Sequence, residues 1–250
     1  MNYLFCDLDD TLFQSRRKTP DTPGVTVAAH GPDGVPNGFM TAGQRKAFDA
    51  MLGAMTLIPV TARDRNAYAR VQLPPAPFAI INHGGIILDA SGKPLQSWYD
   101  RSAEHAHAAR PWLDDLHRKA VEFLGSEGLS VISRIIGDFD LPFYWLSKYF
   151  SGHEDHLDRM ERELIIPWME HHPNLAWIHR NGNNLAVLPR TLQKRHAVSF
   201  LLDVLRQDDP SLVSWGMGDS LSDIPFIMEC DYMIAPKSSQ IVTLVSERNE

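Results

Sequence analysis

The sequence predicts an α/β protein whose parallel-sheet core is interrupted by a second, α+β domain. Short apolar segments recur along the chain, and several of them stop abruptly at polar residues, as buried parallel strands do at their carboxyl ends. Stretches with helical spacing of apolar residues lie between several of these segments. The middle of the chain has a different pattern, in which a helix and two strands occur in the same order twice. These observations favour one domain inserted within another.

The first third of the chain contributes three of the expected core strands. The apolar run 3–6 stops at the carboxylate-rich sequence Asp7-Leu8-Asp9-Asp10-Thr11. Residues 25–40 are typical of a hairpin that turns at Pro32-Asp33-Gly34, and Thr41 is expected to cap a helix that extends to about residue 55. Two further buried strands are expected at 57–61 and 78–82. The first of these contains Pro59, which is unusual because proline cannot donate to a central ladder.

The middle of the chain predicts a small antiparallel sheet with helices on one face. A hairpin around residues 89–93 precedes a helix at 102–124, which we expect to break early at Pro111. Strands at 129–136 and 143–148 follow, then a helix at 155–171 and two strands that turn at Asn181-Gly182. The helix-strand-strand unit is therefore used twice.

The last part of the chain returns to the core pattern. A helix at 194–207 has one apolar face, and strands are expected at 211–215 and 232–235. That face is formed by Ala197, Val198, Leu201, Leu202 and Leu205. No sequence repeat or flexible linker separates the segments. We therefore expect residues 1–85 and 190–250 to form the core domain and residues 86–189 to form the inserted domain.

Composition and charge exclude several function classes. Apolar residues make up 44% and charged residues 22% of the chain, which is typical of a soluble globular protein. A formal net charge of -7 argues against a nucleic-acid partner, because phosphate binding needs a basic surface. Cys6 and Cys230 cannot form a disulfide framework, and no apolar run reaches the length of a membrane span. Without the basic segment of a signal peptide before the first strand, we expect a cytoplasmic protein without a membrane partner. The oligomeric state stays open.

Polar side chains follow three of the predicted core strands, at the point where each strand ends. These are Asp7 with Asp9, Thr61, and Asp219, and Asp223 adds a further carboxylate close by. The carboxyl ends of parallel strands meet at one edge of a sheet, where α/β folds bind ligands. So many carboxylates are costly without a cation, and an oxygen-rich set suits Mg²⁺. A carboxylate beside that ion can attack a phosphoryl group to give an aspartyl phosphate.

These motifs resemble those of the haloacid dehalogenase-like superfamily. Asp7-Leu8-Asp9-Asp10-Thr11 resembles its DxDxT signature, and Gly218-Asp219-Ser220-Leu221-Ser222-Asp223 resembles its GDxxxD motif. Thr61 and Lys194 are similar to the second and third motifs, in the same order over the whole core. The insert resembles the class-two cap, and Asn82-His83-Gly84-Gly85 resembles the "NG" that often precedes this cap. The resemblance implies a Rossmann-like core with an inserted α+β cap domain, as in sucrose-phosphate, trehalose-phosphate and mannosyl-phosphoglycerate phosphatases.

The resemblance also implies a role for each motif residue. Asp7 would be the nucleophile and a Mg²⁺ ligand. Asp9 would protonate the leaving oxygen and then activate water, with its backbone carbonyl on the metal. Thr61 and Lys194 would hold the phosphoryl oxygens, and Asp219 and Asp223 would complete the metal site. The implied reaction is hydrolysis of a phosphomonoester, and the implied substrate is a phosphorylated sugar or a related small metabolite.

Simpler explanations exist for some of these residues. Thr61 could cap the helix that follows it, and Arg190 or Arg195 could replace Lys194 as the phosphate-binding cation. The eleven histidines form no HExxH or Cys/His pattern, so surface or capping roles explain them better than a metal site. Three basic residues on predicted strands of the insert could reach the leaving group or form an exposed rim: Arg134, Lys148 and Arg180.

Other functions remain open at this point. A phosphomutase uses the same aspartyl phosphate but excludes water and passes the phosphoryl group to a second position on the substrate. A haloalkanoate dehalogenase needs neither the acid at Asp9 nor the metal carboxylates. A non-catalytic binding protein is disfavoured because the acidic residues are all present, Asp7 and Asp9 included.

Overall fold

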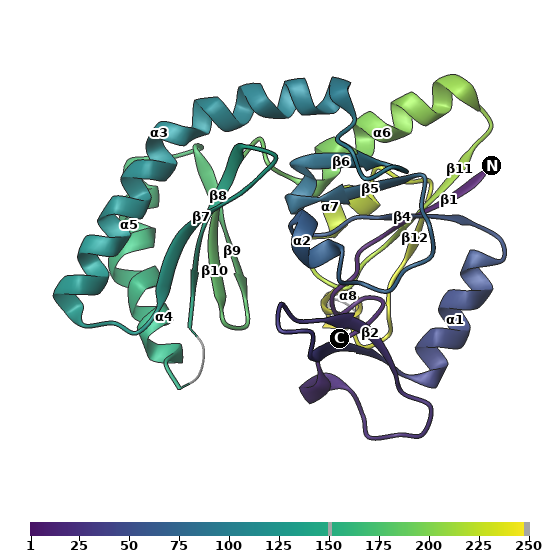
Figure 1. Ribbon diagram of the computed structural model, residues 1–250, viewed down its shortest axis with the longest axis horizontal. Helices are drawn as coiled ribbons and strands as arrows, with labels where there is room; N and C mark the ends of the chain where they lie inside the picture. The colour runs from purple at the N-terminus through teal and green to yellow at the C-terminus, as the bar shows by residue number, and fades with distance from the viewer. Residues whose placement is uncertain (150–151, 248–250) are drawn as a thin grey trace. The chain divides into compact units, whose positions relative to one another are not determined.

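The computed structural model describes residues 1–149 and 152–247, so the last three residues of the predicted core segment 190–250 lie outside the described residues (Figure 1). The chain divides into two compact units. Unit 1 comprises Met1–Tyr99 with Gln193–Glu250, and unit 2 is Asp100–Leu192. The sequence places these boundaries after residues 85 and 189. The first boundary lies later in the structure because β6 (Ile86–Asp89) pairs antiparallel with β5 (Phe78–Ile81) and so belongs to unit 1.

A four-stranded parallel sheet lies at the centre of unit 1. Its order is β12 (Tyr232–Ile234), β11 (Val213–Met217), β1 (Asn2–Cys6), β4 (Thr56–Pro59). The predicted parallel-sheet core is thus confirmed, and β1 lies between two parallel neighbours. An isolated parallel bridge between Val60 and Ile80 links β4 to β5.

Pro59 is accommodated because its nitrogen faces away from β1, the strand with which β4 pairs along its length. Val60 donates its backbone N–H to the carbonyl of Cys6 in β1, so the nitrogens of Pro59 and Thr61 face the opposite side. On that side Thr61 donates its backbone N–H to Ile80, within the isolated bridge between Val60 and Ile80. Proline at position 59 therefore removes no hydrogen bond between β4 and β1.

Both faces of this sheet are covered, which explains why its strands are almost continuously apolar. Leu4 and Cys6 pack in a buried cluster with Phe48 of α1 (Ala42–Leu52) and with the hairpin β2 (Thr26–His30) and β3 (Pro36–Met40). Phe5 points to the other face, toward α6 (Lys194–Asp208), α7 (Ile224–Ile227) and α8 (Gln240–Glu247). Thr41 caps α1 in a capping box with Gln44, and the predicted apolar face of α6 is fully buried.

Unit 2 is a four-stranded antiparallel sheet with its helices on one face (Figure 1). Apolar side chains of the strands and helices form a single buried cluster that includes Trp145, Leu116, Leu157, Trp168 and Val187. The sheet order is β7 (Ile132–Asp138), β8 (Leu141–Lys148), β10 (Asn184–Pro189), β9 (Ala176–Asn181); the helices are α3 (Gln96–Glu127), which begins in unit 1, α4 (Glu154–Met160), η3 (Glu161–Ile165) and α5 (Ile166–His171). The predicted architecture of two helix-strand-strand units is confirmed.

Two helices of unit 2 differ from the prediction, and each difference involves proline. Helix α3 continues through Pro111, whose ring is exposed, while Leu113 and Leu116 are fully buried. A proline inside a helix costs about 3 kcal/mol. Burial of each leucine contributes about 1.5–3 kcal/mol, so packing maintains the helix. The predicted helix at 155–171 contains the wider π-turn η3, which ends two residues before Pro167.

In residues 1–149 and 152–247, no helix has both the length and the apolar character to cross a membrane.

Candidate active site

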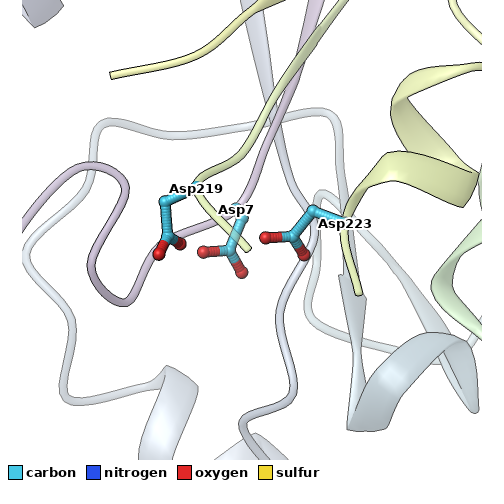
Figure 2. Close-up of side chains that lie close together, drawn as sticks. All are labelled: Asp7, Asp219 and Asp223. Atoms are coloured by element: carbon cyan, nitrogen blue, oxygen red, sulfur yellow. The ribbon is translucent and has the colours of Figure 1, made fainter. Parts of the chain in front are cut away.

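The ends of three neighbouring strands position three of the predicted site residues. Asp7 directly follows β1, while Asp219 and Thr61 each lie two residues beyond the ends of β11 and β4. The backbone N–H of Asp7 donates to the carbonyl of Met217 at 2.9 Å, which extends the pairing of β1 with β11 into the site. One carboxylate oxygen from each of Asp7, Asp219 and Asp223 lies within 4.8 Å of the others, and Figure 2 shows the three carboxyl groups side by side.

A tight turn after β1 folds Thr11 back onto the carboxylates. Asp10 adopts a left-handed conformation with φ 65°, which aspartate tolerates better than most residues. Its backbone N–H donates to Phe13, closing the turn. The Thr11 hydroxyl consequently lies 2.9 Å from both Asp7 Oδ2 and Asp219 Oδ1. A hydroxyl carries one hydrogen, so both contacts are hydrogen bonds only when one of these carboxyls is protonated.

A glycine allows Asp223 to approach the site closely. A β-carbon at Gly218 would lie 2.6 Å from the β-carbon of Asp223, which is closer than two carbon atoms can pack. Ser220 donates to Asp223 Oδ2 from its backbone nitrogen at 3.1 Å and from its hydroxyl at 2.7 Å. These bonds orient Asp223 so that its other oxygen accepts a hydrogen bond from Lys194.

Lys194 is the cation that the fold brings to this cluster. Its Nζ donates to Asp7 Oδ1 at 2.6 Å and to Asp223 Oδ1 at 2.7 Å. Lys194 is the first residue of α6, where the helix dipole makes a positive charge unfavourable by about 0.3–1 kcal/mol. The two carboxylates must therefore stabilise the ammonium. Of the alternatives, Arg195 has an exposed side chain.

Gly84 fixes the start of α6 from the opposite side. Its φ of 96° is accessible mainly to glycine, and a β-carbon there would lie 2.6 Å from the backbone oxygen of Gln193 and 3.1 Å from Cα of Lys194. The sequence Asn82-His83-Gly84-Gly85 therefore acts as a close-packed support for the residue that carries the ammonium.

The site contains more negative than positive charge. Burial raises the pKa of Asp7 to about 8, although Lys194 acts in the opposite direction. Burial also raises the pKa of Asp219 to about 6, against the hydrogen bond from Thr11. Burial opposes ionisation of Asp223 as well, but the charge and hydrogen bond of Lys194 hold its pKa below the usual value. Burial would lower the pKa of Lys194, yet Asp223 and Asp7 raise it. Three carboxylates thus lie close together, and the single ammonium of Lys194 bonds to two of them, Asp7 and Asp223.

This donor set fits a hard divalent cation. Carboxylate oxygens are the ligands that Mg²⁺ and Ca²⁺ prefer. The raised pKa values of Asp7 and Asp219 indicate that further positive charge would stabilise their ionised forms. A divalent ion near Asp7, Asp219 and Asp223 would provide that charge.

Thr61 lies at the site but does not cap the following helix. Its side chain is 1% exposed, and its hydroxyl accepts a hydrogen bond from the backbone N–H of Arg63 at 3.2 Å. The N-cap of α2 (Arg65–Tyr68) is Asp64, so the capping alternative is wrong. The carbonyl of Thr61 accepts from the N–H of His83 at 3.1 Å, which joins this loop to the residues before Gly84. Phosphate binding by Thr61 stays a prediction.

The side chain of Asp9 lies apart from the three grouped carboxylates. It is 47% exposed and forms a two-pronged ion pair with Arg63, whose Nε donates to Oδ2 at 2.8 Å and Nη2 to Oδ1 at 2.7 Å. A metal contact through the backbone carbonyl of Asp9 stays a prediction. No sequence motif singled out Arg63 as a functional residue, although it lies only two residues after Thr61.

No histidine in the described part of the chain belongs to a candidate metal group, and several of them have structural contacts. Nδ1 of His171 and of His172 each contacts a backbone carbonyl four residues earlier. The rings of His153 and His156 stack at 4.6 Å between centroids.

Comparison with solved structures confirms the fold. No protein-family model matches the chain, and neither does any curated protein. The C-terminal domain of trehalose-6-phosphate phosphatase from C. albicans is 14% identical, with a TM-score of 0.55 over 100% of this chain and 78% of that chain. A Eubacterium rectale protein is 10% identical, with a TM-score of 0.55 over 98% of this chain and 91% of that one. A Thermoplasma acidophilum protein is 14% identical, with a TM-score of 0.51 over 98% and 89%. The resemblance expected from the motifs is therefore confirmed at the level of the fold.

Proposed function

We propose that this protein is a Mg²⁺-dependent phosphatase that hydrolyses phosphomonoesters through a phosphorylated Asp7. The observation that carries the proposal is the buried cluster in which Asp7, at the carboxyl end of the central strand, shares Lys194 with Asp223. Phosphoryl transfer depends mainly on alignment and on neutralisation of charge. The cluster supplies a fixed carboxylate, an ammonium beside it and a set of oxygen ligands for a cation.

In the first half of the reaction, a carboxylate oxygen of Asp7 attacks phosphorus and the bond to the leaving oxygen breaks. Asp9 transfers a proton to that oxygen, so the alcohol leaves neutral. Lys194 and Thr61 donate hydrogen bonds to the phosphoryl oxygens. Mg²⁺ held by Asp7, Asp219 and Asp223, with the carbonyl of Asp9, would supply positive charge that offsets the repulsion between carboxylate and phosphate.

In the second half, the roles of the two aspartates change. Asp9, now a carboxylate, takes a proton from water while the water oxygen attacks phosphorus. The bond between phosphorus and Asp7 breaks, which releases inorganic phosphate and restores both carboxyl groups to their initial state. The net reaction consumes one phosphomonoester and one water, and yields one alcohol and one phosphate.

Unit 2 would act as the cap that selects a phosphorylated sugar or a related small metabolite. The C. albicans protein of the same fold is by its name a trehalose-6-phosphate phosphatase, which supports a sugar phosphate as the substrate class. Strand register and side-chain contacts in unit 2 distinguish the basic residues that are candidates for contacting the leaving group. Ser133 contacts His117 of α3, so its neighbour Arg134 lies on the helix-free face of the sheet. Lys148 shares that face, because Leu146 pairs with Arg134. Arg180 instead pairs with Asp158 and Glu161 on the helices.

Phosphate release from a panel of phosphorylated sugars, glycerates and nucleotides tests the function. We expect turnover that excess EDTA abolishes and Mg²⁺ restores, and that Asp7→Asn lowers by several orders of magnitude. Asp10→Asn removes a carboxylate three residues away that pairs with Lys18, and should retain most activity. If Asp7→Asn keeps more than a few per cent of the activity, Asp7 is not the nucleophile. Lys148→Met should raise KM for the sugar phosphate more than for a small aryl phosphate, whereas Arg180→Met should leave their ratio unchanged.

A further inference from the structure

Arg63 and Asp9 form an ion pair that none of the motif assignments uses. The two residues are 54 positions apart, on the loops that follow β4 and β1, and two N–H groups of the guanidinium meet the two carboxylate oxygens. Paired forks of this kind restrict orientation as well as distance. The side chain of Arg63 is only 15% exposed, although that of Asp9 is 47% exposed.

The guanidinium is held in place before it reaches Asp9. Its Nη1 donates to the carbonyl of Ala67 in α2 at 3.2 Å, and its central carbon lies 5.3 Å from the centroid of the Phe13 ring. The backbone of Arg63 is fixed as well, because its N–H donates to Thr61 Oγ1 and its carbonyl accepts from Asn82. An arginine restrained on all these sides can orient a partner that is itself half exposed.

Stability alone does not account for this arrangement. An ion pair with one half-exposed partner contributes about 0–1 kcal/mol. The pair has a more specific geometric consequence: the carboxylate of Asp9 is directed at Arg63, while those of Asp7, Asp219 and Asp223 gather in one group. Two aspartates only two residues apart therefore have different surroundings: Asp7 lies among carboxylates and the ammonium of Lys194, and Asp9 is held in a fixed direction by a guanidinium.

We propose that Arg63 is a positioning residue that orients Asp9 for proton transfer to and from the reacting oxygens. This inference rests on the proposed phosphatase function. Arg63 acts through Asp9 and takes no part in bond making: Asp9 gives its proton to the leaving oxygen as the bond from phosphorus to that oxygen breaks, and regains a proton from the attacking water. A misaligned Asp9 impairs these transfers, but attack by Asp7 does not depend on it.

The test is the dependence of kcat/KM on the leaving group. This constant reports the steps up to departure of the alcohol, where an alkyl phosphate needs a proton and a dinitrophenyl phosphate, whose leaving anion is stable, does not. We expect Arg63→Gln to lower kcat/KM about 10- to 100-fold for alkyl phosphates, a part of the usual contribution of general acid catalysis. The value for dinitrophenyl phosphate should be nearly unchanged. Arg63→Lys, which keeps the charge but loses the fork, should give an intermediate loss.

Controls separate positioning from a direct contact with substrate. Arg65→Gln removes the same charge two residues away, at an exposed position, and should leave both constants unchanged. In the Asp9→Asn background, Arg63→Gln should cause no further loss, because its effect passes through Asp9. An equal loss for both substrate classes, or a full additional loss in the Asp9→Asn background, overturns the inference. Thermal melting of each variant identifies loss by unfolding, and Arg63→Lys then provides the folded comparison. If the wild-type protein releases no phosphate, or Asp7→Asn stays active, it is the proposed function that fails.

Discussion

Lys194→Met removes the ammonium that lies between two buried carboxylates. Asp7 and Asp223 are 8% and 2% exposed, so water cannot replace the lost hydrogen bonds. Removing one partner of a buried ion pair costs about 3–5 kcal/mol, because the remaining charge is left uncompensated. We expect a loss of this size in the free energy of unfolding at pH 8 without metal.

The loss should be smaller at pH 6, because a buried carboxyl can escape the penalty by holding a proton. In the wild-type protein the charge and hydrogen bond of Lys194 keep the pKa of Asp223 low despite its burial. In the variant that pKa rises above its unfolded value, so the folded state holds a proton that the unfolded chain releases. Stability then falls as the pH rises above the unfolded pKa, by at most about 1.4 kcal/mol per pH unit for each such carboxyl.

Urea unfolding in excess EDTA at pH 6 and pH 8 measures both effects. Arg195→Met is the matched control, since it removes a neighbouring positive charge at an exposed position and should change stability by less than about 0.5 kcal/mol. An equal loss in the two variants, or a loss in Lys194→Met that does not depend on pH, would refute the reasoning.

Two further predictions concern the metal site and the support of α6. Mg²⁺ should bind the wild-type protein more tightly as the pH rises from 6 to 8 and should release protons on binding, because the raised pKa values of Asp7, about 8, and Asp219, about 6, leave protons that the ion must displace. Calorimetry in buffers of different ionisation enthalpy measures this release, and binding without release would contradict those pKa values. Gly84→Ala should cost more stability than Gly92→Ala and should also lower phosphatase activity. Both glycines have a positive φ, a backbone conformation that costs alanine about 1–2 kcal/mol. Only Gly84 also lies against the backbone of Gln193, whereas a β-carbon at Gly92 would meet nothing within 4 Å. Equal melting temperatures for these two variants would show that the close approach is unimportant.

The local sequence pattern was sufficient to predict most of the helices and strands. The capping box at Thr41, the hairpin turn at Gly34 and the apolar face of α6 all depend on residues within a few positions of one another. Pattern was insufficient for α3, where it predicted a break at Pro111. The cost of that proline is local, but the burial that offsets it comes from strands and helices of unit 2 that lie far along the chain.

The sequence by itself determined that Asp7 and Asp219 converge, because each follows a strand and parallel neighbours end at the same edge. Only the tertiary structure decided which cation joins them. Arg190, Lys194 and Arg195 are equivalent as charges in the sequence, and the packing of Gly84 against the start of α6 points one of them at Asp7. The same holds for Asp9, whose partner Arg63 is 54 residues away. The position of a residue after a strand determines where its Cα lies, but the position of its charged group depends on the residues that the tertiary structure packs around the side chain.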